Sequence, residues 1–261
     1  FWKHFYPERI NLLGTTEMSF LRELDEAEFN ERIDEYVDFN PVCIIVSRGE
    51  SVPDYLLEQA EEKGIPVLST KISTTRFSSM LLNYLEEKLA PVKVIHGVLV
   101  DIYGIGVLIR GESGIGKSET AIELVKRGHR LVADDIIEIK KIGELHLSGT
   151  APENARYFLE MRGIGIINVK NLFGAGAVKH SAPIDLAVRF ERWREGEEYE
   201  RLGLDDNKTE LMELEIDEIT IPVKPGRNLA LVLEVAAMNY RMKTMGYNAA
   251  VDFTENIMRK K

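Results

Sequence analysis

The sequence predicts an α/β fold with two domains: a small amino-terminal α/β domain and a carboxy-terminal domain built around a phosphate-binding loop. The chain has 261 residues, more than a single hydrophobic core usually serves. Short β-branched runs alternate with stretches of helical periodicity along it. Residues 111–118 read GESGIGKS, which matches the phosphate-loop pattern GxxxxGKS.

The first domain is predicted over residues 1–90. Residues 42–46 (VCIIV) and 65–68 are typical of short strands, and residues 54–63 of a helix. Residues 74–89 carry apolar side chains at steps of three and four, as an amphipathic helix does. This region contains no motif typical of catalysis or metal binding, so we expect it to serve assembly or regulation. A second ligand site is the alternative. The chain begins without methionine inside a segment that reads as structured, which indicates a domain truncated at its start.

The second domain is predicted over residues 91–261, after the helical pattern ends near Ala90. Two apolar runs flank Tyr103 and Gly104, which favours a hairpin that leads into the phosphate loop. Further segments follow along the chain. We expect a helix at 117–127, a short strand at 131–133, a helix at 154–162, a mixture of strand and loop at 163–178, strands at 184–190 and 216–223, a helix from Asn228 to Gly246, and a last helix at 248–258.

The phosphate loop has the residue types that polyphosphate binding needs. Its glycines let the backbone turn tightly and aim N–H groups at phosphate oxygens, while a lysine adds a point charge and a serine offers a hydroxyl to Mg²⁺. A strand before it and a helix after it supply the setting in which such a loop works. The predicted phosphate-binding residues are Gly111, Glu112, Ser113, Gly114, Ile115, Gly116, Lys117 and Ser118.

Asp134 and Asp135 follow the short strand predicted after the loop's own helix. Carboxylates at this position can hold Mg²⁺, and one of them can take a proton from an attacking hydroxyl. The alternative is a solvated acidic pair at a strand end.

For three other candidates, the residues alone favour a structural or surface role over a catalytic one. Glu160 and Arg162 are two residues apart (E-x-R), and this pattern is typical of the exposed end of a helix. Arg201 reads as a surface charge, and His96 as a structural histidine within an apolar strand.

Composition excludes several classes of protein. A net charge of −10 argues against general nucleic-acid binding, which requires a basic face. The single cysteine, Cys43, excludes a disulfide framework. No apolar stretch is long enough to cross a bilayer and the amino end lacks an export signal, so we expect a cytoplasmic protein with no membrane partner.

Five blocks in fixed order give the sequence a family resemblance. They are VIHGVLVDIYGIGVLI running into GESGIGKSE, then LVADD, LEMRGIGIINV, YERLGL, and PVKPGRNLALVLEVAAMNYRMKTMGYNAA. Together they resemble the bacterial HPr kinase/phosphorylase family over residues 91–253. The amino-terminal strings YPERINLLGTTEMSFL and VCIIVSRG are similar to that family's first domain. The resemblance implies a carboxy-terminal P-loop kinase domain of the phosphoenolpyruvate-carboxykinase-like type.

The resemblance also implies an activity and a partner. Members use ATP, or pyrophosphate, to phosphorylate a serine of the phosphocarrier protein HPr. They reverse the reaction with inorganic phosphate, which removes the phosphoryl group and yields pyrophosphate. This activity regulates carbon catabolite repression and sugar uptake. Mg²⁺ is the implied cofactor and a homohexamer the implied assembly, with the helix after Arg227 reaching a neighbouring subunit or the substrate.

Site residues carry over position by position. The resemblance places the catalytic roles on His96, Lys117, Asp135 and Arg201, and the Mg²⁺ ligands on Ser118 and Glu160. Residues 159–168 match the signature stretch tied to both activities, with Asp134 and Arg162 in support. The loop tied to dephosphorylation corresponds to Pro222, Val223, Lys224, Pro225, Gly226 and Arg227. In this mechanism Asp135 accepts the serine proton and returns it in the reverse direction.

Two alternatives to this function differ in the substrate. A GTPase-type switch needs an N-K-x-D motif that recognises guanine. The most similar segment, residues 207–210 (NKTE), ends in glutamate, which argues against a GTPase. A kinase for a small metabolite stays open because phosphoenolpyruvate carboxykinase shares a related nucleotide-binding core. Phosphoserine formation on HPr separates a protein kinase from a metabolite kinase.

Overall fold

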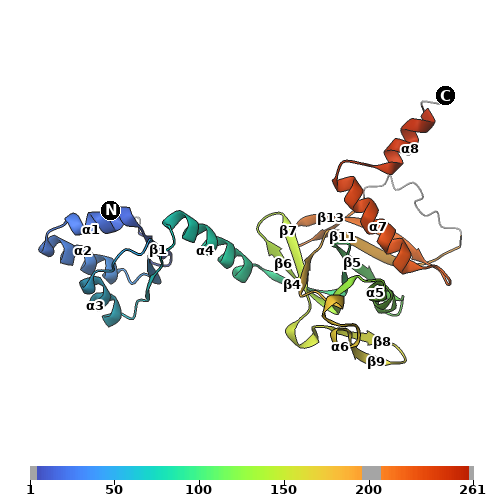
Figure 1. Ribbon diagram of the computed structural model, residues 1–261, viewed down its shortest axis with the longest axis horizontal. Coiled ribbons are helices and arrows are strands. Elements are labelled where there is room, and N and C mark those ends of the chain that lie inside the picture. Colours follow the sequence, from blue (N-terminus) through green and yellow to red (C-terminus); the bar gives the residue numbers. More distant parts are fainter. Residues whose placement is uncertain (1–4, 196–206, 259–261) are drawn as a thin grey trace. The chain divides into compact units, whose positions relative to one another are not determined.

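A computed structural model describes residues 5–195 and 207–258. The chain forms two compact units, Phe1–Lys88 and Leu89–Lys261 (Figure 1).

The first unit contains a three-stranded parallel sheet in the order β1-β2-β3. Its strands are β1 (Ile10–Leu13), β2 (Cys43–Val46) and β3 (Val67–Ser69). Its helices are α1 (Thr15–Glu23), α2 (Glu26–Asp38), α3 (Asp54–Glu62) and α4 (Thr74–Leu89). The core forms where β2 packs against α2 and α3, with Ile44, Ile33 and Leu56 fully or almost fully buried. The strand expected from the run VCIIV is therefore the centre of this sheet.

The second unit is built on an eight-stranded mixed sheet in the order β10-β7-β6-β4-β5-β11-β13-β12. Strands β5, β11 and β13 run parallel to one another, and the remaining pairings are antiparallel. The strands are β4 (Val92–Ile102), β5 (Ile105–Gly111), β6 (Arg130–Ile142), β7 (His146–Thr150), β10 (Ser181–Pro183), β11 (Leu186–Arg192), β12 (Lys208–Leu211) and β13 (Leu214–Val223). A separate hairpin joins β8 (Phe158–Met161) to β9 (Gly165–Asn168).

Helices α5 (Lys117–Lys126) and α7 (Leu229–Thr244) pack on one face of this sheet (Figure 1). Successive strand residues point to opposite faces, so Val98 and Val100 of β4 meet these helices while Leu99 enters the core on the other face. The short helix α6 (Val169–Phe173) and the final helix α8 (Ala249–Met258) complete the described helices.

Local signals in the sequence identified several elements of the second unit. The β4–β5 hairpin forms as expected, with Tyr103 and Gly104 both at positive φ (54° and 89°) in its two-residue turn. This is the backbone that a type I′ turn requires. Asn228 caps α7 by accepting the Leu231 N–H at 3.0 Å.

The prediction of a short strand at 131–133 is wrong in its extent. Strand β6 continues to Ile142, and Asp134 and Asp135 lie within it, paired in register with Val98 and Gly97 of β4. Pairing continues because the segment after the aspartates (IIEIKKI) resumes an apolar alternation that buries Ile137.

The helix predicted at 154–162 is also wrong. Residues Glu153–Ala155 form one 3₁₀ turn, and β8 follows it in antiparallel pairing with β9. The burial of this segment repeats every two residues: Leu159 is buried, while Phe158 and Glu160 are exposed. That period is typical of a strand, and Gly163 at φ 83° lies in the tight turn that closes the hairpin. Glu160 and Arg162 therefore belong to a hairpin rather than to a helix end.

Candidate active site

The phosphate loop lies between β5 and α5, as its sequence predicts. Gly114 and Gly116 adopt φ angles of 78° and 105°, which side chains with a Cβ rarely accept. The Lys117 ammonium turns back over the loop and donates to the carbonyls of Gly111 and Glu112, each at 2.9 Å. The N-terminus of α5 points its first N–H groups toward the space above the loop, where a phosphate oxygen can accept from them.

Asp134 connects the phosphate helix to two strands. Its Oδ1 accepts the Ser118 hydroxyl at 2.8 Å, and its Oδ2 accepts the Glu160 backbone N–H at 3.1 Å. Burial raises the pKa of the Asp134 carboxyl, while these two hydrogen bonds act in the opposite direction. The charge of Lys117 also favours the ionised form of Asp134, and a divalent cation beside the carboxylate would favour it further.

Asp135 lies at the edge of the same pocket with its side chain largely exposed. In a regular strand, successive side chains point to opposite faces of the sheet. The φ of 64° at Asp135 interrupts this alternation, so the carboxylates of Asp134 and Asp135 line the same pocket. Oδ1 of Asp135 lies 3.6 Å from Nδ1 of His96, which comes from β4. Opposite Asp135, a side chain at Gly97 would come within 2.9 Å of the Ile109 carbonyl, so glycine permits close packing here.

The β8–β9 hairpin closes the pocket from another side. Glu160 lines the pocket, and the Arg162 guanidinium donates to the Ser113 hydroxyl at 3.1 Å. A Cβ at Gly114 would lie 2.4 Å from the same guanidinium. Arg162 therefore packs directly on the phosphate loop.

The resulting pocket has a volume of about 130 Å³. It brings together side chains from the phosphate loop, the strand β6 and the β8–β9 hairpin. Its lining comprises Val98, Ser113, Gly114, Gly116, Lys117, Ser118, Glu119, Asp134, Asp135, Glu160 and Arg162. Val98 and Glu119 were not expected in the site, because the sequence analysis assigned no role to either residue.

The oxygen donors in this pocket suit Mg²⁺. Two hydroxyls (Ser113 and Ser118) and four carboxylates line it; the carboxylates are Glu119, Asp134, Asp135 and Glu160. Within residues 5–195 and 207–258 no cluster of three or more His, Cys, Asp or Glu forms a ready metal cage. Such a cage is not needed, since Mg²⁺ usually binds through one or two carboxylates together with water and substrate phosphates.

Arg201, an expected site residue, falls outside the described residues. The expected loop 222–227 lies beside the phosphate pocket. Residues 222–227 run from the end of β13 into the turn before α7, where Arg227 Nη1 donates to the Pro222 carbonyl at 2.9 Å. Gly226 and Arg227 line a neighbouring groove, not the phosphate pocket.

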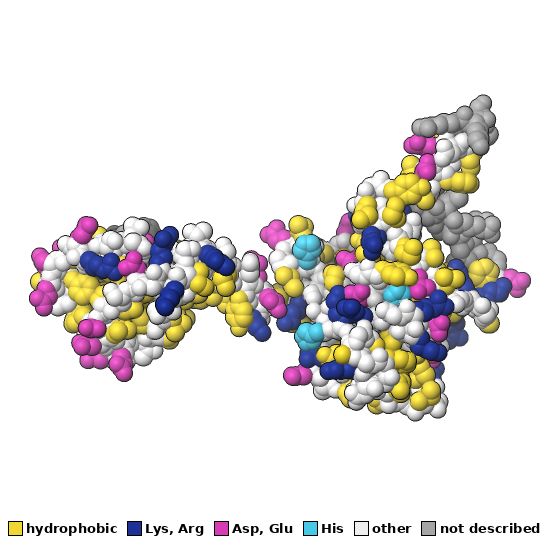
Figure 2. All heavy atoms as spheres, viewed as in Figure 1, with side chains coloured by type: hydrophobic (Ala, Val, Ile, Leu, Met, Phe, Trp, Pro, Cys, Tyr) yellow, Lys and Arg dark blue, Asp and Glu magenta, His cyan; other side chains and the backbone are white. Residues whose placement is uncertain are grey.

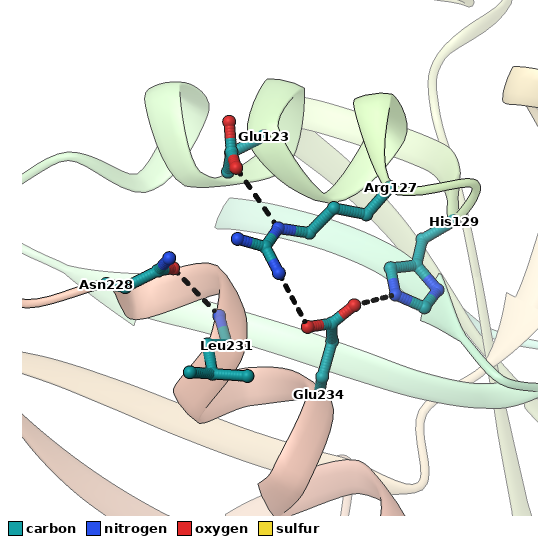
Figure 3. A network of polar contacts seen from close by, with 6 residues as sticks. All are labelled: Glu123, Arg127, His129, Asn228, Leu231 and Glu234. Carbon is teal, nitrogen blue, oxygen red and sulfur yellow. Dashed lines mark hydrogen bonds and ion pairs between the residues drawn. The ribbon is translucent and has the colours of Figure 1, made fainter.

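A polar network between α5 and α7 was missed from the sequence (Figure 3). Glu234 of α7 accepts from Arg127 Nη1 at 3.1 Å, and its other oxygen lies 3.0 Å from Nε2 of the buried His129. The Tyr103 ring packs edge-on against His129 at 4.6 Å between centroids. One signal was available, because Glu234 is the single charge within the apolar stretch LALVLEVAAM.

Replacing Glu234 with alanine is expected to lower the free energy of unfolding by about 2–4 kcal/mol, because His129 and Arg127 lose a shared buried acceptor. Urea unfolding of the whole chain measures this. Val235→Ala on the exposed side of the same helix is the matched control, with an expected change within about 0.5 kcal/mol. Equal stabilities of the two variants would contradict a structural role for the network.

Fold and site together define a class. A strand, a glycine-rich phosphate loop and a helix, with a lysine, a serine and strand carboxylates converging on one pocket, make a P-loop kinase domain. No described helix is long and apolar enough to span a membrane.

The chain belongs to the HPr serine kinase family. The family model "HPr Serine kinase C-terminal domain" matches residues 87–257, and "HPr Serine kinase N terminus" matches residues 1–85. Membership makes the chain an enzyme with kinase activity.

Curated relatives agree over the full chain. The HPr kinase/phosphorylase of Caldanaerobacter subterraneus subsp. tengcongensis is 50% identical over 260 residues, which cover 100% of this chain and 85% of the relative. That of Bacillus mycoides is 52% identical over 258 residues, covering 99% and 84%. A solved structure of the Hpr(Ser) kinase/phosphatase from Coxiella burnetii has a TM-score of 0.55 at 34% identity, and the match covers 62% of this chain and 98% of that one.

Proposed function

We propose that this enzyme transfers a phosphoryl group from ATP, or from pyrophosphate, to a serine of HPr, and that it removes the group again by phosphorolysis. The names of relatives at about half identity support the substrate. The observation that carries the chemistry is that Lys117, Ser118, Asp134 and Asp135 line one pocket.

In the forward direction the loop N–H groups and Lys117 hold the donor's phosphates. The serine hydroxyl oxygen attacks the terminal phosphorus, and Asp135 takes the hydroxyl proton. The bond to the leaving group breaks, which is ADP when ATP is the donor and inorganic phosphate when pyrophosphate is the donor. Asp135 suits this role because its side chain is exposed at the pocket edge, within reach of a protein substrate. Mg²⁺, held by Ser118 and Glu160 with help from Asp134, would neutralise charge on the phosphate oxygens.

In the reverse direction an oxygen of inorganic phosphate attacks the phosphorus of phosphoserine. The bond to the serine oxygen breaks, Asp135 returns the proton to that oxygen, and pyrophosphate leaves. His96, 3.6 Å from Asp135, orients this carboxylate in our proposal, and Arg201 stabilises the transferring group. The loop 222–227 contributes mainly to this direction.

The exposed apolar surface of α7 and α8 supports a protein partner. Met238, Met242 and Met245 are each about half exposed or more, and Val251 and Phe253 continue the surface on α8 (Figure 2). Contiguous apolar surface of this kind marks a protein contact. We infer that it meets HPr or a neighbouring subunit of a homohexamer. The hexamer and the cytoplasmic location stay predictions.

Incubation with HPr, ATP and Mg²⁺ is expected to produce one phosphoserine on HPr, detected by mass spectrometry. Adding phosphate to the purified phosphoprotein should then release pyrophosphate. GTP in place of ATP, and small metabolites in place of HPr, test the two alternatives named above. Absence of phosphoserine while a small hydroxylated metabolite is phosphorylated would overturn the proposal.

A further inference from the structure

A groove lies directly beside the phosphate pocket, between the first turns of α5 and α7. Its volume is about 420 Å³, against about 130 Å³ for the phosphate pocket. A volume in this range is typical of small-molecule sites, which span roughly 300–1,000 Å³. Gly116 and Glu119 line both spaces, so the two adjoin at these residues. A ligand that fills the phosphate pocket can therefore extend into the groove.

The two walls of the groove have different chemistry. The α5 wall carries the carboxylates of Glu119 and Glu123, which lie about 6 Å apart along the helix axis. The α7 wall carries apolar Leu229 and Ala230, with Arg227 just before them. Carboxylates accept from neutral hydroxyl and amino groups, whereas an arginine plane and aliphatic side chains pack against a flat aromatic ring.

Charge decides which end of a nucleotide can lie here. The glycines of the phosphate loop and Lys117 line the other space and hold the phosphate chain there, which leaves the groove to the uncharged nucleoside. Glu123 is the less free of the two carboxylates, since it pairs with Arg127 at 3.1 Å, and Arg127 also contacts Glu234 of α7. The same network (Figure 3) holds both walls of the groove at a fixed spacing.

We propose that this groove binds the nucleoside of the donor nucleotide, with the ribose hydroxyls on Glu119 and the base between Arg227 and Leu229. The inference rests on the proposed use of ATP and deepens it. It assigns Glu119, which had no role in the sequence analysis, as a binding residue for the ribose. Pyrophosphate has no nucleoside and needs only the phosphate pocket.

The test compares direct binding of ATP and of pyrophosphate, each with Mg²⁺, by calorimetry on the full chain. Glu119→Ala is expected to raise the Kd for ATP about 3- to 10-fold, the effect of losing one or two hydrogen bonds. Removing a negative charge beside the phosphate pocket should leave the Kd for pyrophosphate unchanged or lower it. If Glu119 acted only through its charge, the substitution would lower the Kd for both ligands. A higher Kd for ATP therefore identifies a contact with the nucleoside.

Two further variants sharpen the result. Glu119→Gln keeps an acceptor oxygen and should restore most of the ATP affinity. Lys126→Ala, on the same helix but outside both spaces, is the control and should bind both ligands as the original chain does. Equal effects of Glu119→Ala on ATP and pyrophosphate would overturn the groove assignment alone. Failure of the original chain to bind either ligand would instead remove the proposed function.

Discussion

Replacing Asp135 with asparagine is expected to lower the rate of phosphoryl transfer to HPr by about 10²–10⁴-fold, the usual contribution of a general base. The substitution keeps the size and shape of the side chain but removes its ability to take a proton. Binding of ATP should stay within about twofold, because the side chain lies at the pocket edge and Lys117 and the loop N–H groups are untouched. Single-turnover kinetics and calorimetry measure the two effects separately.

The reverse reaction gives an independent check of Asp135. Phosphorolysis of phosphoserine-HPr should fall by a similar factor, since the same carboxyl group returns the proton. Glu138→Gln is the matched control: it lies on the same strand β6, outside the pocket lining, and should leave both rates unchanged. A variant Asp135→Asn with near-normal rates would remove this residue from the mechanism.

Replacing Lys117 with methionine should lower kcat/KM by about 10²–10³-fold, the range found when one preorganised charged or polar donor to a transition state is lost. Unlike the Asp135 variant, this one should also weaken binding, of ATP and pyrophosphate alike, because both ligands place phosphates on the loop. Lys126→Met, at the far end of α5, is the control. Retained pyrophosphate affinity in Lys117→Met would contradict the assignment of the loop.

The thermal stability of Lys117→Met shows whether weaker binding comes from the lost ligand contact or from a damaged fold. Among the residues that the structure describes, Lys117 donates to two carbonyls of its own loop. Thermal unfolding of Lys117→Met should therefore lie within a few degrees of the original chain, a shift that corresponds to about 1 kcal/mol or less.

Elements with a local cause were predictable from the sequence. The phosphate loop, the Tyr103–Gly104 hairpin and the start of the helix at Asn228 each depend on residues within a few positions of one another, and all three form as expected. Their backbone geometry follows from glycine at positive φ or from a side chain that caps its own helix.

Features that depend on distant pairing were not predictable. Strand β6 extends past Asp135 because β4 lies beside it along its whole length, and β8 is a strand because β9 pairs with it. Neither partner is visible from a window of ten residues, where charge or helical spacing dominates the pattern. The distance between His129 and Glu234 in sequence, 105 residues, puts the α5–α7 network beyond any local signal.

In the candidate site, too, some features were predictable from the sequence and others were not. The sequence supplied a pair of neighbouring aspartates but could not distinguish their environments. Asp134 is buried against Ser118, while Asp135 stands at the surface beside His96. The difference arises from one left-handed backbone position within a strand, which no residue pattern specifies, although aspartate tolerates it better than most residues.

The position of Lys117 has a consequence for how a ligand arrives. Its ammonium already has two acceptors in the carbonyls of Gly111 and Glu112. An incoming phosphate oxygen therefore exchanges one set of partners for a stronger, charged one, and does not have to recruit a freely rotating side chain. These two contacts restrict the lysine before any ligand arrives, so a nucleotide is expected to meet a cation that is already held at the loop.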